Sequence, residues 1–428
     1  LIRNSPILDS LILMKILYVV QAYHPSWGGV QWMVQQLAER MVAGYGDTVT
    51  VFTTTAYSCQ LFIDARQPTL PVGATTLNGV TVRRFPVFNR LTWLRLAAAR
   101  IGYKLRLPGQ DWLRCLYFGP IVPGLARAVA QSEAEVIVAS SFPMQHMYAA
   151  LRGGQQAGVP VIFIGTVHPA DPWGYDVPRM YRAIRAAQGY AALSEYERAY
   201  LTAHGVPASG MRTIGAGVDV AAFDNEVTRA AGADWRTRLG WGDDPVVATV
   251  GRQTAYKRVD VVLAAMRQVW AQIPEARLLI AGARTGYTAQ LEAEIAALPP
   301  VQRAQVTLLP DFDEADKPAL YAACDVLVQP SERESFGIVF LEAWAAGKPV
   351  VGSRSGAAPT VIDAERDGLL AVYGDSADWA RALLRLLGDA TLRAEMGARG
   401  REKVYAQYTW DVITRQFRDL YVDVRGAP

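Results

Sequence analysis

The chain has 428 residues, of which 51% are hydrophobic and 19% charged, so it is long enough for two or three domains that each bury a core. Its three cysteines lie far apart without a CxxC pair, and its four histidines never fall at metal-ligand spacing, which argues against a disulfide framework and a structural zinc site. No apolar run reaches the roughly 18 residues that a membrane span needs, and a reducing, cytoplasmic setting is the default expectation.

The first residues are not expected to form a signal peptide. Asn4, Pro6 and Asp9 interrupt the apolar residues of positions 1–13, and a signal peptide needs an unbroken apolar core. A clean strand pattern begins at Met14. We expect Met14 to be the natural start, with the preceding residues disordered or a start-site artefact.

The first half of the chain alternates short apolar strands with helices. Strands are expected at Lys15–Val20, Thr48–Thr53, Val80–Phe85, Glu135–Ala139, Val161–Ile164, Tyr190–Leu193 and Met211–Ile214, and helices at Gly29–Val42, Ile121–Ala130, Met144–Gln155 and Glu195–His204. Because continuous apolar strands separated by helices indicate a parallel sheet covered on both faces, we predict a doubly wound α/β domain.

Positive charge is concentrated in this first half. Residues 65–132 contain ten basic residues and one acid, Asp111, a local charge of +9 in a chain of net charge +3. Within this window, the segment Arg90–Arg106 interleaves basic with bulky apolar residues, and Arg95 and Arg106 lie close to three helical turns apart. Such a cationic amphipathic surface favours contact with anionic lipid. A solvated face is the alternative, and no motif supports nucleic-acid binding.

The apolar pattern fades after Val218 and then restarts. Residues 219–244 are charged and rich in small side chains, so a linker is expected there. A second doubly wound domain follows, with a cleft expected at the carboxyl ends of the strands. Its strands are expected at Val246–Val250, Arg277–Ala281, Val306–Leu309, Val326–Gln329, Pro349–Gly352 and Gly368–Ala371, and its helices at Val259–Gln272, Thr288–Ala297, Lys317–Ala323, Ile338–Ala346 and Ala377–Leu387, before a last helix at about 410–424.

The most informative segment is Glu334-Ser-Phe-Gly-Ile-Val-Phe-Leu-Glu342, which lies between two of these strands. Its helix is expected to open at Ser335 or Phe336 and to close at a left-handed cap on Gly347. At about 1.5 Å per residue, the two carboxylates stand on the order of 10 Å apart. This separation suits the two ends of one long ligand better than an acid/base pair, with a helix N-terminus between them for a diphosphate. The alternative is that Glu334 caps the loop and Glu342 faces solvent.

Three other loops that follow predicted strands offer candidate site residues. Arg252 and Lys257 lie on the first loop of the second domain, where two cations can neutralise a diphosphate. Gly28 and Gly29 either let a ligand approach a helix N-terminus or serve a tight turn. His168 lies just beyond a buried strand, where site residues gather, although a lone histidine is often structural.

Several motifs resemble those of one known family. Tyr321-Ala-Ala-Cys-Asp325-Val-Leu-Val-Gln-Pro-Ser331, then Glu334-Ser-Phe-Gly337, then Glu342-Ala-Trp-Ala-Ala-Gly-Lys-Pro349 are similar to motifs of the retaining glycosyltransferases of family 4. The resemblance runs from Met14 to about residue 425. It implies the α/β GT-B fold, in which two Rossmann-like domains face a cleft. The implied divisions are an acceptor domain at 14–225, a linker at 226–244, a nucleotide-sugar domain at 245–408, and a helix at 409–428 that crosses back to the first domain.

The resemblance also implies roles for the candidate residues. Arg252 and Lys257 would contact the donor diphosphate, and Glu334 the donor sugar. Glu342 would hold the ribose hydroxyls, and His168 would lie near the sugar. The implied catalytic set is Arg252, Lys257, Glu334 and His168, and the implied donor-binding set is Gly28, Gly29, Phe336, Gly337, Ile338 and Glu342.

The implied reaction moves a hexosyl unit from a nucleotide-diphosphate sugar to a hydroxyl of a glycan or lipid-linked acceptor. It would proceed by front-face displacement with retained anomeric configuration, without a cofactor, and the leaving diphosphate would help deprotonate the acceptor. Two places depart from the family pattern: Gly282-Ala-Arg284-Thr stands where Gly-x-Gly-Pro is common, and Pro310 stands where glycine is common. The donor base, the sugar and the acceptor therefore stay open.

Asp311-Phe-Asp313 has the Asp-x-Asp pattern that binds metal in other sugar-transferring enzymes. Asp313, however, precedes a helical run and has Asp316 three residues on, as at a helix start. We therefore predict a capping role and no essential metal.

Two alternatives to the transferase stay open. One is a sugar phosphorylase or epimerase of the same fold. The other is a catalytically silent, membrane-peripheral protein that binds lipid or protein without turnover. The expected location of the chain is cytoplasmic, with peripheral contact at the inner face of the plasma membrane.

Overall fold

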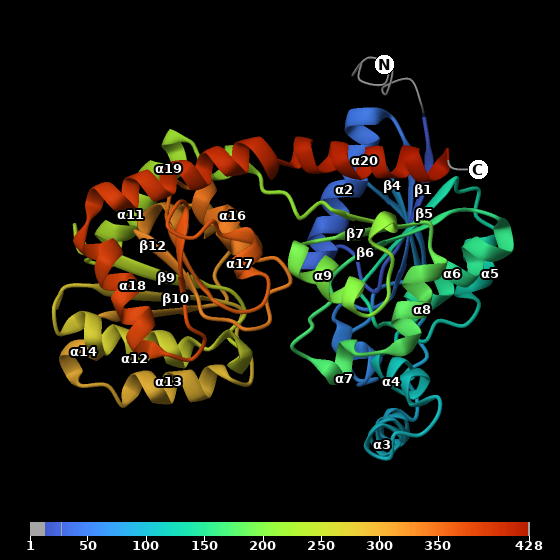
Figure 1. Ribbon diagram of the computed structural model, residues 1–428, viewed down its shortest axis with the longest axis horizontal. Helices are drawn as coiled ribbons and strands as arrows, with labels where there is room; N and C mark the ends of the chain where they lie inside the picture. The colour runs from blue at the N-terminus through green and yellow to red at the C-terminus, as the bar shows by residue number, and fades with distance from the viewer. Residues whose placement is uncertain (1–12, 27, 427–428) are drawn as a thin grey trace. The chain divides into compact units, whose positions relative to one another are not determined.

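The computed structural model describes residues 13–26 and 28–426, and they form two compact units (Figure 1). The first unit runs to Gly215 and includes the residues from Thr414 onward, and the second unit is Ala216–Ile413. The expectation for the segment before Met14 lies outside the described residues, apart from the exposed Leu13.

The first unit is built on an eight-stranded sheet of order β3-β4-β2-β1-β5-β6-β7-β8. All neighbouring pairs are parallel except β3 with β4, which is antiparallel. The sequence pattern misses β3 because its residues are mostly exposed and it has no apolar run. The strands are β1 Lys15–Val19, β2 Thr48–Thr54, β3 Gly73–Leu77, β4 Val80–Phe85, β5 Val136–Ser140, β6 Val161–Ile164, β7 Gly189–Ala192 and β8 Met211–Thr213.

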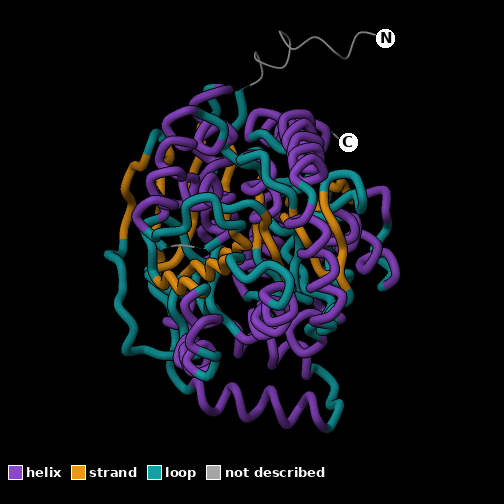
Figure 2. The backbone as a smooth tube through the Cα atoms, turned by 90° about the vertical axis from the view of Figure 1, so that its left-hand side faces the viewer, coloured by secondary structure: helices purple, strands orange, loops and turns teal. Residues whose placement is uncertain are grey.

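Helices cover the strands of this unit, as Figure 1 shows, and Figure 2 gives the helices and strands of the chain from a second direction. The core combines the apolar residues of the central strands, such as Ile137 and Phe163, with Met147 of α6 and Met180 of α8. The α-helices before Gly215 are α2 Gly29–Tyr45, α3 Thr92–Lys104, α4 Gln110–Phe118, α5 Leu125–Ala130, α6 Gln145–Ala157, α7 Pro172–Tyr175, α8 Pro178–Ala186 and α9 Glu195–Ala203.

The second unit has a six-stranded sheet of order β11-β10-β9-β12-β13-β14. All its pairs are parallel, as its strand–helix alternation predicts. The strands are β9 Val246–Val250, β10 Arg277–Gly282, β11 Val306–Pro310, β12 Val326–Gln329, β13 Val350–Ser353 and β14 Gly368–Ala371, and the α-helices are α10 Val220–Phe223, α11 Glu226–Arg238, α12 Val259–Trp270, α13 Thr288–Ala296, α14 Pro300–Ala304, α15 Lys317–Ala323, α16 Ile338–Ala345, α17 Ala358–Val361, α18 Ser376–Gly388 and α19 Ala390–Gln407. The last helix, α20 Trp410–Arg425, belongs to the first unit from Thr414 onward.

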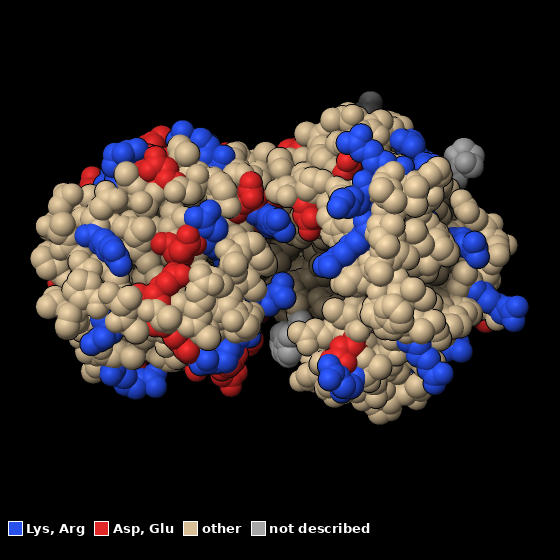
Figure 3. Space-filling view, turned by 90° about the horizontal axis from the view of Figure 1, so that it is seen from below, with Lys and Arg blue, Asp and Glu red and all other residues tan. Residues whose placement is uncertain are grey.

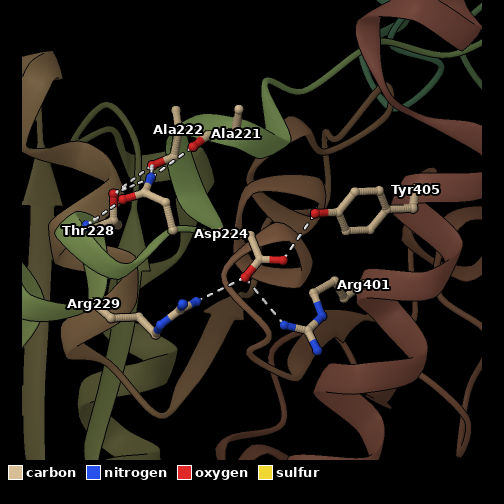
Figure 4. A network of polar contacts seen from close by, with 8 residues as sticks. Ala221, Ala222, Asp224, Thr228, Arg229, Arg401 and Tyr405 are labelled. Carbon is tan, nitrogen blue, oxygen red and sulfur yellow. Dashed lines mark hydrogen bonds and ion pairs between the residues drawn. The ribbon is translucent and has the colours of Figure 1, made fainter.

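The segment expected to be a linker forms part of the second unit. Helix α11 fills most of residues 226–244 and packs against α15, with Gly232 in contact with Ala322. Just before α11, Asp224 accepts hydrogen bonds or ion pairs from Arg229, Arg401 and Tyr405 (Figure 4). Arg401 and Tyr405 lie on α19. The linker expectation is thus wrong, because a charged surface helix with few apolar residues resembles a linker in sequence.

The last helix, α20, is anchored in the first unit by a buried ion pair. The guanidinium of Arg418 and the carboxylate of Asp47 are almost completely buried, and Asp47 also accepts a hydrogen bond of 2.9 Å from the Met14 backbone N–H. Nearby, the hydroxyls of Tyr421 and Tyr18 lie 3.1 Å apart. A buried charge without its partner is strongly destabilising, so this pair fixes the end of α20.

We therefore expect Arg418→Met to lower the free energy of unfolding by about 3–5 kcal/mol, because it leaves the Asp47 carboxylate buried without its cation. Arg415→Met, at an exposed position of the same helix, should change it by less than about 0.5 kcal/mol. Adding Asp47→Asn to Arg418→Met should recover part of the loss. Denaturant unfolding measures all three, and equal effects of the two single variants would contradict the assignment.

Candidate functional site

The strongest cluster of candidate residues lies on the loops after β9, β10 and β12, which are adjacent strands of the second sheet. The loop after β9 is tied to the loop after β10 by hydrogen bonds from Gly251 N to Ala281 O (2.9 Å) and from Gln253 N to Ala283 O (3.0 Å). The approach is so close that a Cβ on Gly282 would lie 1.9 Å from the Gly251 carbonyl oxygen. Only glycine fits at 282, and the cationic loop is therefore held in place by backbone contacts.

Lys257 and Glu334, both predicted site residues, form an ion pair at this sheet edge. Lys257 Nζ lies 2.5 Å from Glu334 Oε1, and their side chains are 15% and 12% exposed. The Gln329 side-chain amide at the end of β12 donates to the same oxygen at 2.7 Å. Two residues that are 77 positions apart are thus held with their charges in contact, close to solvent but mostly shielded from it.

Arg252 lies on the same loop as Lys257, with an exposed side chain. It forms neither an ion pair nor a hydrogen bond with its side chain within the described part of the chain. The predicted pair of loop cations therefore consists of one lysine held by a carboxylate and one arginine directed to solvent.

Glu342 does not face solvent. Its side chain is 7% exposed, and its two oxygens meet Lys317 Nζ and the Tyr321 hydroxyl, each at 2.7 Å. Lys317 and Tyr321 are four residues apart on α15, so they share one face of that helix. Burial and the Glu342 carboxylate raise the pKa of Tyr321. Burial alone lowers the pKa of Lys317, but Glu342 and Glu314 outweigh it and the pKa is raised.

The contacts with Lys317 and Tyr321 do not use the whole acceptor capacity of Glu342. Each carboxylate oxygen has two acceptor positions, and each oxygen meets one of these two donors. The alternative in which Glu342 faces solvent is therefore wrong, because the side chain is only 7% exposed. The distance between the carboxylates of Glu334 and Glu342 stays a prediction.

Helix α16 confirms the start at Ile338 that the strand–helix alternation predicts and contradicts an opening at Ser335 or Phe336. It begins at Ile338, two residues beyond Phe336, and its N-cap is Gly337 with φ of 96°. A side chain at 337 would be strained by that φ, and its Cβ would lie 2.5 Å from the Phe340 ring. Phe336 is buried, with its ring 5.6 Å from that of Tyr408. The left-handed cap at Gly347 is confirmed, with φ of 72° and its N–H bonded to Trp344 O at 2.8 Å.

The Asp311–Asp313 pair serves local structure. Asp313 caps the short turn Glu314–Asp316 through the Ala315 N–H, as predicted. Asp311 accepts a hydrogen bond of 2.8 Å from the Arg284 backbone N–H. Among the described residues, no group of three or more His, Cys, Asp or Glu side chains is arranged to hold a metal ion.

The candidates of the first unit lie at the carboxyl ends of its strands. Gly28 precedes α2 as its N-cap and Gly29 opens the helix. His168 follows β6, half-buried, with its ring 5.1 Å from that of Tyr175. The structure places Gly28, Gly29 and His168 at sheet-edge loops, as predicted, and their roles stay predictions.

Sequence reasoning missed the residue that shapes the His168 loop. Glu197 is completely buried, and its carboxylate accepts 2.8 Å hydrogen bonds from Val167 N, Leu193 N and the Tyr190 hydroxyl. Ser194-x-x-Glu197 is a capping-box pattern, which was a usable signal, and the Ser194 side chain does cap α9. The carboxylate, however, turns to the loop that leads to His168. Burial raises the pKa of Glu197 to about 7.

Two family models match the chain. "Glycosyl transferase 4-like domain" matches residues 28–217, and "Glycosyl transferases group 1" matches residues 233–403. Together the two models span most of both units. The model that matches residues 233–403 includes Lys257, Glu334 and Glu342. The chain belongs to the family 4 glycosyltransferases.

Relatives and solved structures agree with this family 4 assignment. A D-inositol 3-phosphate glycosyltransferase of Saccharomonospora viridis is 35% identical over 224 residues, which is 51% of each chain, so the match spans about half the length of that relative. A GDP-mannose-dependent alpha-(1-6)-phosphatidylinositol monomannoside mannosyltransferase of Mycobacterium tuberculosis is 26% identical over 95% of this chain and 97% of its own. The structure of Anabaena HepE in complex with UDP and glucose matches with a TM-score of 0.73 at 19% identity, over 96% of this chain and 100% of that chain. The fold of this family 4 chain is GT-B.

The buried Glu197 predicts a pH dependence of stability. Its pKa is about 7 in the folded chain against an ordinary 4.5. Between these values the folded state keeps a proton that the unfolded chain releases, so its contribution to stability is full below about pH 4.5 and is lost as the pH rises through 7. Between pH 5 and pH 8, the wild type should lose on the order of 2–3 kcal/mol relative to Glu197→Gln. Denaturant unfolding at both pH values measures this, and parallel pH profiles of the two proteins would contradict it.

Proposed function

We propose that this chain transfers a hexosyl unit from a nucleotide-diphosphate sugar to a hydroxyl of a glycan or lipid-linked acceptor, with retention of the anomeric configuration. The observation that carries the proposal is the Lys257–Glu334 ion pair, held at the carboxyl edge of the parallel sheet in a family 4 chain. Ligands of such sheets bind at this edge. The names of the relatives, which specify inositol phosphate and phosphatidylinositol mannoside chemistry, support a phosphorylated or lipid-linked acceptor.

Four residues have separate roles in the proposed donor site. Lys257 and Arg252 neutralise the diphosphate, and Glu334 accepts hydroxyl donors of the sugar. Glu342 accepts the ribose hydroxyls beside its contacts with Lys317 and Tyr321. Because Lys257 already neutralises Glu334, the carboxylate of Glu334 can lie beside an anionic donor, with the lysine shared between carboxylate and phosphate.

The proposed chemistry is front-face displacement. The bond between the anomeric carbon and the diphosphate oxygen breaks, the acceptor hydroxyl attacks from the same face, and its proton passes to a leaving phosphate oxygen. The cations of the β9 loop stabilise the charge that develops on that diphosphate. Phe336, Gly337 and Ile338 are proposed to contribute backbone N–H groups to this donor site. For Gly28, Gly29 and His168 of the first unit, we propose ligand-binding roles at the carboxyl edge of their own sheet.

The test of this function is the turnover of Lys257→Ala. We expect turnover to fall about a hundredfold or more, because losing one such charge contact costs on the order of 3 kcal/mol of transition-state stabilisation. Wild type is first assayed with UDP-, GDP- and ADP-sugars, and with phosphate in place of the nucleotide to exclude a phosphorylase. Lys15→Ala, which removes an exposed lysine of the first unit, is the matched control. Normal folding with near-normal turnover of Lys257→Ala would contradict the proposal.

We also propose that the first unit contacts the anionic inner face of the plasma membrane. None of the described helices is long and apolar enough to cross a bilayer, so the contact would be peripheral. Helix α3 exposes Trp93, Leu94 and Ile101, which are 72%, 47% and 56% exposed. Arg90, Arg100, Lys104 and Arg106 are exposed around them.

One part of the sequence-based surface is wrong. Arg95 does not join the cationic face, because its guanidinium donates to Leu116 O (3.0 Å) and Phe62 O (3.2 Å). Arg106 lies beyond the end of α3, at φ of 51°. Arg114, also counted in the basic window, is 1% exposed and donates to the carbonyls of Pro172, Trp173 and Asp176. Part of the local charge of +9 in residues 65–132 therefore belongs to arginines that bond to carbonyls inside the first unit.

Liposome flotation at low salt tests the membrane contact. Wild type should float with vesicles of phosphatidylcholine and 30% phosphatidylglycerol. The double variant Trp93→Ser/Leu94→Ser should bind at least tenfold more weakly, because the apolar side chains that enter the interface are lost. Val227→Ser, at an 80% exposed apolar residue of the second unit, should bind as wild type does. Failure of the wild type to float, or equal binding by the double variant, would overturn the contact.

A further inference from the structure

A large open pocket lies on the first unit, among helices α4, α5, α6 and α8. Its volume is about 1200 Å³, and all its lining residues lie between Trp112 and Ala183. None of them belongs to the proposed donor site. Figure 1 shows these helices on one side of the first sheet.

The charge of the pocket lining is positive. Arg127, Arg152, Arg179 and Arg182 line it, and no carboxylate does. Arg182 lies 3.2 Å from Asp111 outside the lining. Arg127 and Arg152 are exposed and form no ion pair within the described ranges. At least two of the four arginines therefore have no acid within ion-pair distance among the described residues.

Several polar atoms of the lining are buried without a hydrogen-bond partner among the described residues. They include Nη1 of Arg179 and the amide nitrogen of Gln145. The guanidinium of Arg179 lies over the ring of Tyr148, 4.1 Å from its centroid, and this contact holds the guanidinium at the pocket wall. Burying a donor without an acceptor is costly, so an anion that accepts from Arg179 and Gln145 would be stabilised here.

His146 adds an acceptor to these donors. It is 1% exposed, and its Nε2 lies 2.7 Å from Ser140 O. Because a carbonyl can only accept, Nε2 carries the proton and Nδ1, which has no partner, is an acceptor. Burial lowers the pKa of His146 to about 4, so the ring is neutral at physiological pH. The lining thus matches a ligand with both an anionic group and a hydroxyl.

The pocket borders an exposed apolar residue of α4, and α4 packs against α3. Trp112 of α4 lines the pocket and is 49% exposed, and α4 packs against α3, where Gly102 contacts Leu113. Figure 3 shows the chain from the end that carries α3, where the first unit has a broad uncharged area with Lys and Arg along its margins. A ligand with a polar anionic end and an apolar end would find both surfaces side by side.

We propose that this pocket binds the phosphorylated, hydroxyl-bearing head of an anionic membrane lipid, with the acyl chains leaving along α3 and α4. The proposal rests on the membrane contact proposed above and adds a specific headgroup site to it. The phosphate is bound by the arginines and the Gln145 amide, and a headgroup hydroxyl donates to His146 Nδ1. A glycerol or inositol phosphate head has this combination of groups.

The test compares two double variants that lose the same charge. Arg127→Gln/Arg152→Gln removes two exposed pocket arginines, and Arg267→Gln/Arg366→Gln removes two exposed arginines of the second unit. Binding to vesicles of phosphatidylcholine with 30% phosphatidylglycerol should weaken at least tenfold for the pocket variant and less than threefold for the control. Equal weakening would show general charge attraction and would overturn the site.

Hydrogen exchange with two different probes identifies the ligand. Dihexanoyl phosphatidylglycerol below its micelle concentration should protect the backbone N–H groups of residues 145–156 from hydrogen exchange in wild type and in Trp93→Ser/Leu94→Ser, but not in the pocket variant. Equal protection by inorganic phosphate would indicate a free-phosphate site and would overturn the lipid assignment. The thermal shift with nucleotide sugars should be unchanged in the pocket variant, so a failure here is distinct from a failure of the transferase proposal.

Discussion

The parallel pairing of β10, β9 and β12 is the constraint on which the candidate donor site depends. Parallel neighbours end at the same edge of a sheet, so loops that are far apart in sequence must meet there. This pairing brings Lys257, after β9, within 2.5 Å of Glu334, after β12. The close contact of Gly251 and Gly282 then fixes the β9 loop against the β10 loop. The parallel strand order and the close contact of Gly251 with Gly282 thus bring the charged residues of the candidate site together.

The sequence predicts the buried parallel strands well because each is a short continuous apolar run that tertiary packing reinforces. Val246–Val250, Val326–Gln329 and Gly368–Ala371 are found at the predicted residues. The elements that were missed have the opposite character. Helix α11 and strand β3 are largely polar, and α19 has only a few buried residues among many charges. Their structure depends on neighbours, which local patterns do not contain.

The candidate site was predictable in its residues but not in its contacts. Motif spacing selects Lys257, Glu334 and Glu342, yet nothing in the spacing indicates that Lys317 and Tyr321 hold Glu342.

Counting charges in the sequence has the same limit. The basic window is visible in the sequence, but only the structure separates Arg95 and Arg114, which bond to carbonyls inside the unit, from Arg127 and Arg152, which line an open pocket. The positive charge of the first unit thus has a structural part and a part available for ligands.

The central claim is that the cationic loop after β9 binds the diphosphate of a nucleotide donor. Isothermal titration of the wild type and of Arg252→Met with a nucleoside diphosphate and with the matching nucleoside tests it most directly. The account predicts that the variant loses at least tenfold in affinity for the diphosphate and stays within twofold for the nucleoside. Equal affinities of both proteins for the diphosphate would contradict it.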